Sequence, residues 1–499
     1  MQLRQHRRVL PPRPESAASP PAGSRPPSPR WAIAGLSMSM LLSSLGTSIA
    51  SVALPTLASE FAASFAAAQW IVLAYLLAST TLLVTVGRLG DTFGRRRLLL
   101  LGILLFTGAA AVAGAAPTLW VLIVARSAQG LGAAVMVTLT MALIGEAVPK
   151  DRTGSAMGLL GTMSAVGTAL GPSLGGALIA LAGWRAIFLL NVPLGLLSLV
   201  LVLRHLPAET PSRVRGPGRL DVPGTLLLAW TLGAYALAMT TGRGSFGSLG
   251  TGLLLAALVG LALFVWAQHR AASPLIRLSA FRDAQLSRAM VMSMLVSTVV
   301  MATLVVGPFY LSRALALDAA RVGLVMSVGP LVSALTGVPA GRLVDRLGSS
   351  TMTLLGLGGM VLGTAAIALL PDWGGPFGYV VPLVAITACY ALFQAANNTG
   401  VMANVAPDQR GVASALLNLA RNLGLITGAS FLGAVFAIGT GAQDVTQARP
   451  AEAVAGMQAT FAVATLLVVV ALGVGSRGRG ASLRRAAERT GSATPPCRG

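Results

Sequence analysis

The chain has 499 residues, of which 55% are hydrophobic and only 10% are charged, and its formal net charge at pH 7 is +21. Soluble globular domains are about 25% charged. This composition therefore excludes a water-soluble globule, because too little polar surface is available to cover it. It also excludes disorder over most of the length. The positive charge alone suggests nucleic-acid binding, which the distribution of that charge along the chain can test.

The first 30 residues are rich in Pro and Arg, contain no apolar run and are predicted to be a disordered tail. Apolar segments follow that are about 20 residues long, the length needed to cross the hydrocarbon core of a bilayer. They are apolar on all sides, unlike the amphipathic helices of a soluble all-α protein. Fourteen membrane-spanning helices are predicted, at 32–57, 69–87, 98–116, 119–147, 155–182, 186–203, 223–241, 250–268, 289–311, 321–340, 351–370, 378–402, 411–438 and 459–475.

The distribution of basic residues orients these spans. Lys and Arg are enriched in the cytoplasmic loops of membrane proteins. With the N-terminus in the cytoplasm and alternating spans, 29 of the 36 basic residues lie on the cytoplasmic side, and the outer loops have no net charge. Five more lie in the outer loops, and the last two, Arg126 and Arg421, lie within the spans. We therefore expect both termini in the cytoplasm and no nucleic-acid partner, because no contiguous basic domain remains.

An internal repeat indicates the architecture. The loop G-R-L-G-D-T-F-G-R-R from Gly87 matches G-R-L-V-D-R-L-G from Gly341, 254 residues later, and a weaker match begins at Arg152 and Arg410, 258 residues apart. This spacing corresponds to about eight spans, two more than duplicated six-helix halves would give. Parallel repeats of this kind are typical of transporters. The predicted fold is an all-α polytopic membrane protein with seven parts: a tail at 1–30, an N-terminal six-helix bundle at 31–204, a linker at 205–222, two inserted helices at 223–268, a loop at 269–288, a C-terminal six-helix bundle at 289–475 and a basic tail at 476–499.

The repeated loop carries chemistry of its own. In the first copy, Gly87 and Gly94 permit a tight reversal of the chain. Asp91 can accept hydrogen bonds from helix N-terminal amides or from Arg. Arg95, Arg96 and Arg97 face the anionic leaflet. The alternative is an ordinary basic loop that follows the positive-inside rule, which the second copy disfavours. We expect a gating role for Gly87, Asp91, Gly94, Arg95, Arg96 and Asp345.

This loop resembles the signature between the second and third helices of the major facilitator superfamily. Three further stretches resemble that family: R-S-A-Q-G-L-G from Arg126, G-T-A-L-G-P-S-L-G-G from Gly167 and W-R-A-I-F-L-L-N-V-P from Trp184. The second is similar to the motif of the family's exporters, and the third to its fourteen-helix drug:proton antiporter branch. The resemblance covers residues 31–475. It implies alternating access, efflux of small organic molecules and the proton gradient as the energy source, with no cofactor.

Glycines on the fifth predicted span have a physical role beside the resemblance. Gly167, Gly171 and Gly175 recur at every fourth residue, which lets helices approach closely, and Pro172 bends the span. Ordinary helix packing would use the same pattern. In an exporter, this packing seam is the proposed moving element.

Polar residues inside the spans are the candidates for handling substrate or protons. Charges at mid-membrane depth are costly and usually line a cavity, which favours this role for Arg126 and Arg421. Alternatively, each is structural and bonds to carbonyl groups or to the nearby amides of Gln129 and Asn422. Three further polar residues on the twelfth span either bond across helices or line the cavity: Gln394, Asn397 and Asn398.

One departure from the antiporter branch bears on the substrate. That branch carries an Asp in the middle of the first helix, where this chain has Gly46. No acid lies in the middle of a span, and the nearest candidate for coupling is Glu146. Proton-coupled export of cations normally uses a buried carboxylate. We therefore expect a neutral or anionic small-molecule substrate, or coupling through Arg126, Glu146 or Asp91.

The sequence thus predicts a monomeric exporter in the bacterial inner (cytoplasmic) membrane, with the lipid bilayer and a small molecule as its partners. No metal site is expected, and an enzyme is disfavoured because no catalytic set or nucleotide-binding loop was found. A solute importer or facilitator of the same fold is the first alternative. A non-transporting sensor or scaffold is the second.

Overall fold

A computed structural model describes residues 29–147, 153–206, 221–241, 248–271, 274–275, 281–369, 375–405, 410–442 and 445–491. These residues form helices and connecting turns, with no strand among them. In the described part of the chain, 14 helices are long and apolar enough to cross a membrane, which confirms the predicted number. Helices are the expected solution, because a helix satisfies its own backbone hydrogen bonds where no water is present.

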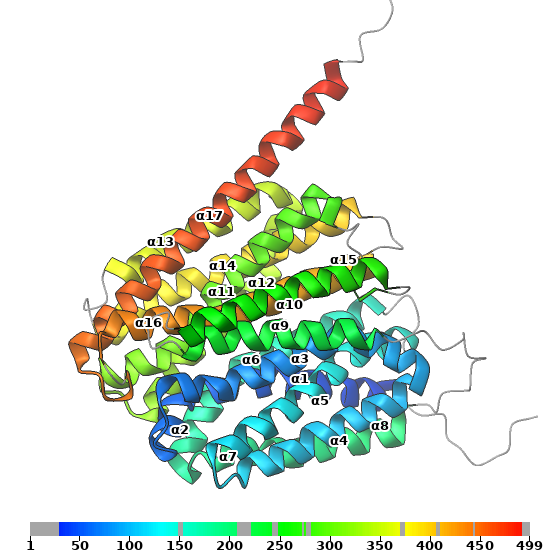
Figure 1. The fold of residues 1–499 in the computed structure, drawn as a ribbon. Coiled ribbons are helices and arrows are strands. Elements are labelled where there is room, and N and C mark those ends of the chain that lie inside the picture. The colour runs from blue at the N-terminus through cyan, green and yellow to red at the C-terminus, as the bar shows by residue number, and fades with distance from the viewer. Residues whose placement is uncertain are drawn as a thin grey trace, which may run out of the picture.

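The N-terminal half packs its spans into one bundle (Figure 1). A short helix, α2 (Leu54–Glu60), follows the first span. We call the end of the molecule that carries it the α2 end, and the opposite end, where α1 begins, the tail end. The helices of this half are α1 (Pro29–Val52), α3 (Phe65–Phe93), α4 (Arg95–Gly114), α5 (Leu119–Ala147), α6 (Thr153–Ala182), α7 (Arg185–Leu189) and α8 (Asn191–His205).

The inserted pair and the C-terminal half follow in chain order. The pair packs against itself, and its first helix lies on α3. One span of the C-terminal half is interrupted by a π-helical turn, η2 (Gly428–Leu432). The remaining helices are α9 (Val222–Thr241), α10 (Ser248–Arg270), α11 (Ala284–Arg313), α12 (Ala319–Leu347), α13 (Ser349–Leu369), α14 (Pro376–Asn404), α15 (Arg410–Thr427), α16 (Gly433–Thr440), the 3-10 turn η3 (Val445–Gln447) and α17 (Pro450–Gly491).

The two halves repeat the same packing. In the N-terminal half α1 lies against α6 and α3 against α5; in the C-terminal half α11 lies against α15 and α12 against α14. The repeat extends to single residues 254 apart. Ala62 and Ala316 both have positive φ, at 47° and 50°. Ser64 and Asp318 both cap a helix by accepting from the backbone N–H three residues on.

The signature loop is shorter than the sequence predicts. Gly87 lies inside α3, which continues to Phe93, and α4 begins at Arg95. The reversal therefore occurs at Gly94 alone, whose φ of 90° favours glycine. Gly348, 254 residues later, makes the matching turn with a φ of 84°. The prediction that Gly87 takes part in the reversal is wrong, because its helical hydrogen bonding continues past it.

The parts predicted outside the bundles are only partly described. Residues 1–28 and most of the linker at 205–222 lie outside the described residues, as do several positions of the loop at 269–288. Helix α17 continues beyond the predicted end of the last span to Gly491 and projects past the bundle (Figure 1). The rest of the predicted basic tail, from residue 492, is outside the described residues.

Helix α6 forms two close seams along its length. A Cβ atom at Gly167 would overlap the Leu41 carbonyl group, and one at Gly171 would overlap the Ser48 side chain, so this row of glycines faces α1. A Cβ atom at Gly176 would lie 2.8 Å from the Cα of Gly323 on α12. The first seam lies within the N-terminal half. The second joins the two halves at the α2 end.

Replacement of Gly171 by Ala should destabilise the protein. Its Cβ atom would meet the Ser48 side chain and lie 2.9 Å from the Ile49 nitrogen, a backbone atom that cannot move alone. We expect a loss of about 1–3 kcal/mol in the free energy of unfolding, typical of overpacking, measured by thermal unfolding in detergent. Gly108→Ala is the control, because no atom lies within 4 Å of a Cβ there. Equal unfolding temperatures for both variants would contradict the close seam.

Candidate functional site

Arg126 lies at the centre of the N-terminal half and is fully buried. Its Nε donates to the Ile71 carbonyl oxygen at 3.0 Å, its Nη2 to the Gly46 carbonyl oxygen at 2.9 Å, and its Nη1 to Gln129 Oε1 at 2.7 Å. The guanidinium carbon is 4.4 Å from the ring centre of Tyr75. Three helices, α1, α3 and α5, thus meet at one side chain. These are the carbonyl and amide contacts of the structural alternative, and a role in transport stays a prediction.

The position that differs from the antiporter branch contacts this guanidinium directly. Gly46 offers Arg126 a backbone carbonyl where a carboxylate would stand in that branch. A Cβ atom at Gly46 would lie 3.1 Å from the Phe106 ring and 3.5 Å from the Tyr75 hydroxyl, so the space around it is filled. The Tyr75 hydroxyl itself donates to the Ser43 carbonyl oxygen at 2.9 Å. The observed hydrogen-bond acceptors of Arg126 are therefore neutral carbonyl and amide oxygens. No carboxylate among them offsets the positive charge of the guanidinium.

Unpaired donors accompany that charge. The Nε2 of Gln129 is buried and has no hydrogen-bond partner in the described part of the chain. A buried donor without an acceptor costs about 1–3 kcal/mol. The Gln129 amide group thus accepts from Arg126 on one side and keeps its two N–H groups for another acceptor. A cation without a carboxylate partner, next to unpaired N–H groups, makes it favourable for hydrogen-bond acceptors to lie nearby. It makes a second cation nearby unfavourable.

The polar residues of α14 divide into two kinds. Asn397 is buried, and its Nδ2 donates to the Ala289 carbonyl oxygen at 3.2 Å and to Ser293 Oγ at 3.0 Å, both on α11. Asn397 therefore bonds across helices, which is the first of its two predicted roles; the second was to line the cavity. Gln394 and Asn398 are half-buried. The Oε1 of Gln394 has no hydrogen-bond partner among the described residues.

Arg421 belongs to a polar stripe on α15. Ser414, Asn418 and Arg421 are exposed, and Asn422 beside them is half-buried. Their spacing of three or four residues places them on one helix face, while the opposite face packs on α11. The stripe lies inside a candidate membrane span, Val412–Thr440. A guanidinium and amides facing hydrocarbon would be costly, and such residues normally face the bundle interior or water.

The basic side chains of the signature loop bind neighbouring segments. Arg96 Nη2 donates to the Leu203 carbonyl oxygen at 2.8 Å, near the end of α8, and Arg88 Nη2 donates to the Pro274 carbonyl oxygen at 2.7 Å. Asp345, in the second copy, is exposed. The side chains of Asp91 and Glu146 lie outside the described part of the structure. The loop thus joins α4 to α8 and α3 to the segment after the inserted pair.

Contacts between the halves at the α2 end were missed by the sequence analysis. The ring centres of Phe65 and Phe309 are 4.7 Å apart, and Phe436 lies 5.7 Å from Phe65. Gln69 Nε2 donates to the Ala429 carbonyl oxygen at 2.8 Å, from α3 to the π turn.

A pocket of about 200 Å³ opens beside these contacts, between the α1–α2 region and α11–α12. Its lining includes none of the predicted site residues. A sequence signal for this end exists in the helix-capping residues Ser64 and Asp318, which lie 254 residues apart and could have predicted the contacts.

Replacement of Arg126 by Lys should destabilise the N-terminal half. A lysine ammonium is a compact charge and cannot reach three acceptors on three helices. Hydrogen bonds to charged groups contribute about 1.5–3 kcal/mol each. We expect a loss of about 3 kcal/mol in the free energy of unfolding, measured in detergent. The half-exposed Arg185 provides the control, because Arg185→Lys should change stability by about 0.5 kcal/mol or less. Similar stability of both variants would show that Arg126 does not hold the three helices together.

The comparisons with known proteins agree with this geometry. Residues 36–429 match the Major Facilitator Superfamily. The chain is 31% identical over 403 residues to the uncharacterized transporter YebQ of Escherichia coli (strain K12), which covers 80% of this chain and 86% of that protein. It is 32% identical over 409 residues to the multidrug resistance protein Stp of Mycobacterium tuberculosis (strain CDC 1551 / Oshkosh), covering 81% and 74%. It is 29% identical over 398 residues to the riboflavin transporter RibZ of Clostridioides difficile (strain 630), covering 80% and 86%.

A solved structure shows the same fold. A bacterial homologue of the human lysosomal transporter Spinster, in an inward-facing and occupied conformation, matches with a TM-score of 0.62 at 17% identity, over 91% of this chain and 98% of that one. The family match and the relatives, two of which are named as transporters, confirm the resemblance seen in the motifs. The chain belongs to the major facilitator superfamily and is a multi-pass membrane transporter, not an enzyme.

Proposed function

We propose that the protein exports small organic molecules, neutral or anionic, across the bacterial cytoplasmic membrane by alternating access, driven by the proton gradient. The observation that carries the substrate class is the polar stripe on α15, which exposes Arg421 within a membrane span. A guanidinium facing an aqueous path binds carboxylate or phosphate groups in two-pronged geometry and binds other oxygen acceptors singly.

The charge balance of the spans supports the same substrate class. Arg126 is buried without a carboxylate among its observed partners, and Gly46 supplies only a carbonyl oxygen. A cationic substrate would meet two positive charges in the membrane interior. An anion or a neutral acceptor would meet donors instead.

Export is supported by the seam of α6 with α12 and by a relative. The glycines of the exporter-like motif lie in close contact with α1, and Gly176 meets Gly323 of the other half. Stp is named as a multidrug resistance protein. RibZ is named as a riboflavin transporter, and a solute importer or facilitator remains the alternative function.

The orientation follows from the charges. With the tail end in the cytoplasm, 29 of the 36 basic residues lie inside. The contacts at the α2 end then close the transporter toward the outside, so that this conformation would receive substrate from the cytoplasm. The matched Spinster homologue was likewise solved facing inward.

Transport of an anionic dye should depend on the gradient, and transport of a cation should not occur. In inside-out membrane vesicles, we expect carboxyfluorescein to accumulate when the vesicle lumen is acidified and to stop accumulating when a protonophore is added. Ethidium should not accumulate under the same conditions. Strong gradient-dependent uptake of ethidium would overturn the proposed substrate class. Uptake of the anionic dye only into right-side-out vesicles would support import.

Removal of the Arg421 charge should impair transport of that dye. Loss of a hydrogen-bonded charge contact of about 1.5 kcal/mol or more corresponds to at least about a ten-fold loss in kcat/KM. We expect this for Arg421→Ala. Arg321→Ala is the matched control, because Arg321 lies exposed at the start of α12 and pairs only with surface Asp318 among the observed ion pairs. Equal transport by both variants would exclude Arg421 from the substrate path.

A further inference from the structure

Two pseudo-equivalent seams join the halves at the α2 end. Gly323 of α12 and Gln69 of α3 are 254 residues apart, the interval that also separates the paired caps and turns. Gly176 and Gly433 are 257 residues apart, one fewer than Arg152 and Arg410. Gly176 meets Gly323, and Gly433 meets Gln69. The repeat therefore places a glycine against a glycine in one seam and a glycine against a glutamine in the other.

The first seam is a contact of backbones. A Cβ atom at Gly323 would lie 2.6 Å from the Pro172 carbonyl oxygen and 2.8 Å from the Cα of Gly176. No side chain separates α6 from α12 at this point. Such a contact permits close approach and sliding, and it contains no directional bond.

The second seam contains a buried polar side chain. Gln69 is 2% exposed, and its Nε2 donates to the Ala429 carbonyl oxygen at 2.8 Å. Ala429 lies in the π turn η2, a kind of helix interruption that is frequent at functional sites. A Cβ atom at Gly433 would overlap the Gln69 amide, and its three nearest atoms all belong to Gln69. The absent side chain at Gly433 is therefore what admits the amide.

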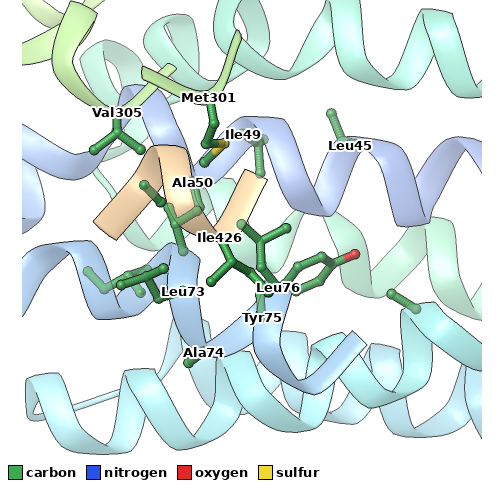
Figure 2. Close-up of a cluster of buried hydrophobic side chains, with 14 of the residues drawn as sticks. Leu45, Ile49, Ala50, Leu73, Ala74, Tyr75, Leu76, Met301, Val305 and Ile426 are labelled. Atoms are coloured by element: carbon green, nitrogen blue, oxygen red, sulfur yellow. The ribbon is translucent and has the colours of Figure 1, made fainter. Parts of the chain in front are cut away.

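The surroundings of this hydrogen bond are apolar. Phe65, one turn before Gln69, packs on Phe309 and Phe436 of the other half. Figure 2 shows a cluster of buried hydrophobic side chains to which both halves contribute, with Ile426 from the C-terminal half and Leu73 and Leu76 from α3. In such surroundings a hydrogen bond is strong and an unpaired amide or carbonyl is costly. When the seam opens, water can bond to the Gln69 amide and to the Ala429 carbonyl group. The direct hydrogen bond between them therefore stabilises only the closed state.

The inserted pair supports the same turn. Helix α9 is joined to α3 by Trp70 Nε1, which donates to Thr240 Oγ1 at 3.1 Å, and by the hydroxyls of Thr85 and Thr225, 3.0 Å apart. Helix α9 also contacts η2. Helices α3 and α9 thus hold the π turn from two directions.

We propose that Gln69 is a latch: its bond to the π-turn carbonyl of Ala429 holds the halves together at the α2 end, while the Gly176–Gly323 seam serves as the sliding contact. Breaking the latch shifts the transporter toward the state open at the α2 end. Gln69 acts through the position of the halves and not through contact with substrate. The inference rests on alternating access, and it is independent of the direction and substrate proposed above.

The test measures the opening of the α2 end directly. Spin labels at Ser59→Cys and Arg321→Cys, one in each half, are placed in a background with Cys389→Ala and Cys497→Ser. Distances between them are measured by double electron–electron resonance in purified full-length protein in lipid nanodiscs. Gln69→Met keeps the length of the side chain and removes the donor. A net hydrogen bond corresponds to about a five-fold change in an equilibrium, so the ratio of long to short distances should rise about five-fold.

The control and a double-mutant cycle make the result specific. Ser79→Ala removes a hydrogen bond within α3, from Ser79 Oγ to the Leu76 carbonyl oxygen, and should leave the ratio unchanged. Gly433→Ala should raise the ratio, because its Cβ displaces the amide, but should add nothing to Gln69→Ala. A wild-type ratio for Gln69→Met, or an undiminished effect of Gly433→Ala in the Gln69→Ala protein, would overturn the latch. Because no substrate or gradient is used, failure of the export assays would leave this result standing.

Discussion

The absence of water from the membrane interior is the constraint on which this structure depends. A polar group there must find its partner inside the protein. Helices satisfy the backbone, which accounts for an all-helical described chain. The same constraint makes each buried polar side chain informative, because its partner reveals which helices must stay together. Arg126 joins α1, α3 and α5 within one half, Asn397 joins α14 to α11 within the other, and Gln69 joins the halves.

These polar contacts divide into permanent and breakable ones. The Arg126 side chain is fully buried and bonds only within the N-terminal half among its observed partners, so the proposed alternating access would leave these bonds intact. The Gln69 bond crosses the boundary between halves, so it must break whenever they separate at the α2 end. Close contacts at glycine occur both within a half and between the halves. Gly167 and Gly171 pack α6 against α1 in the same half, and Gly176 packs α6 against the other half.

The proposed substrate class rests on the charges within the spans. Two arginines, Arg126 and Arg421, lie in the interior of the predicted spans, and the mid-helix position that carries an acid in the related branch is Gly46. Arg126 is enclosed by carbonyl groups, whereas Arg421 stands exposed on the α15 stripe. In the proposed function, Arg126 contributes mainly architecture and a local positive field, and Arg421 is available for contact with substrate. This division connects the proposed neutral or anionic substrate to a specific helix face.

Apolar length, the bias of basic residues and the 254-residue interval determined the number of spans and the duplicated halves from the sequence alone, because each is a property of position along the chain. The sequence also identified Arg126 and Asn397 as polar residues within spans. Their partners depended on tertiary structure, because helix packing decides which carbonyl faces which side chain. The Gln69–Ala429 bond links residues 360 positions apart and uses a π turn that no local pattern announced. Only the packed halves bring the Gln69 donor, the Ala429 acceptor and the space at Gly433 together.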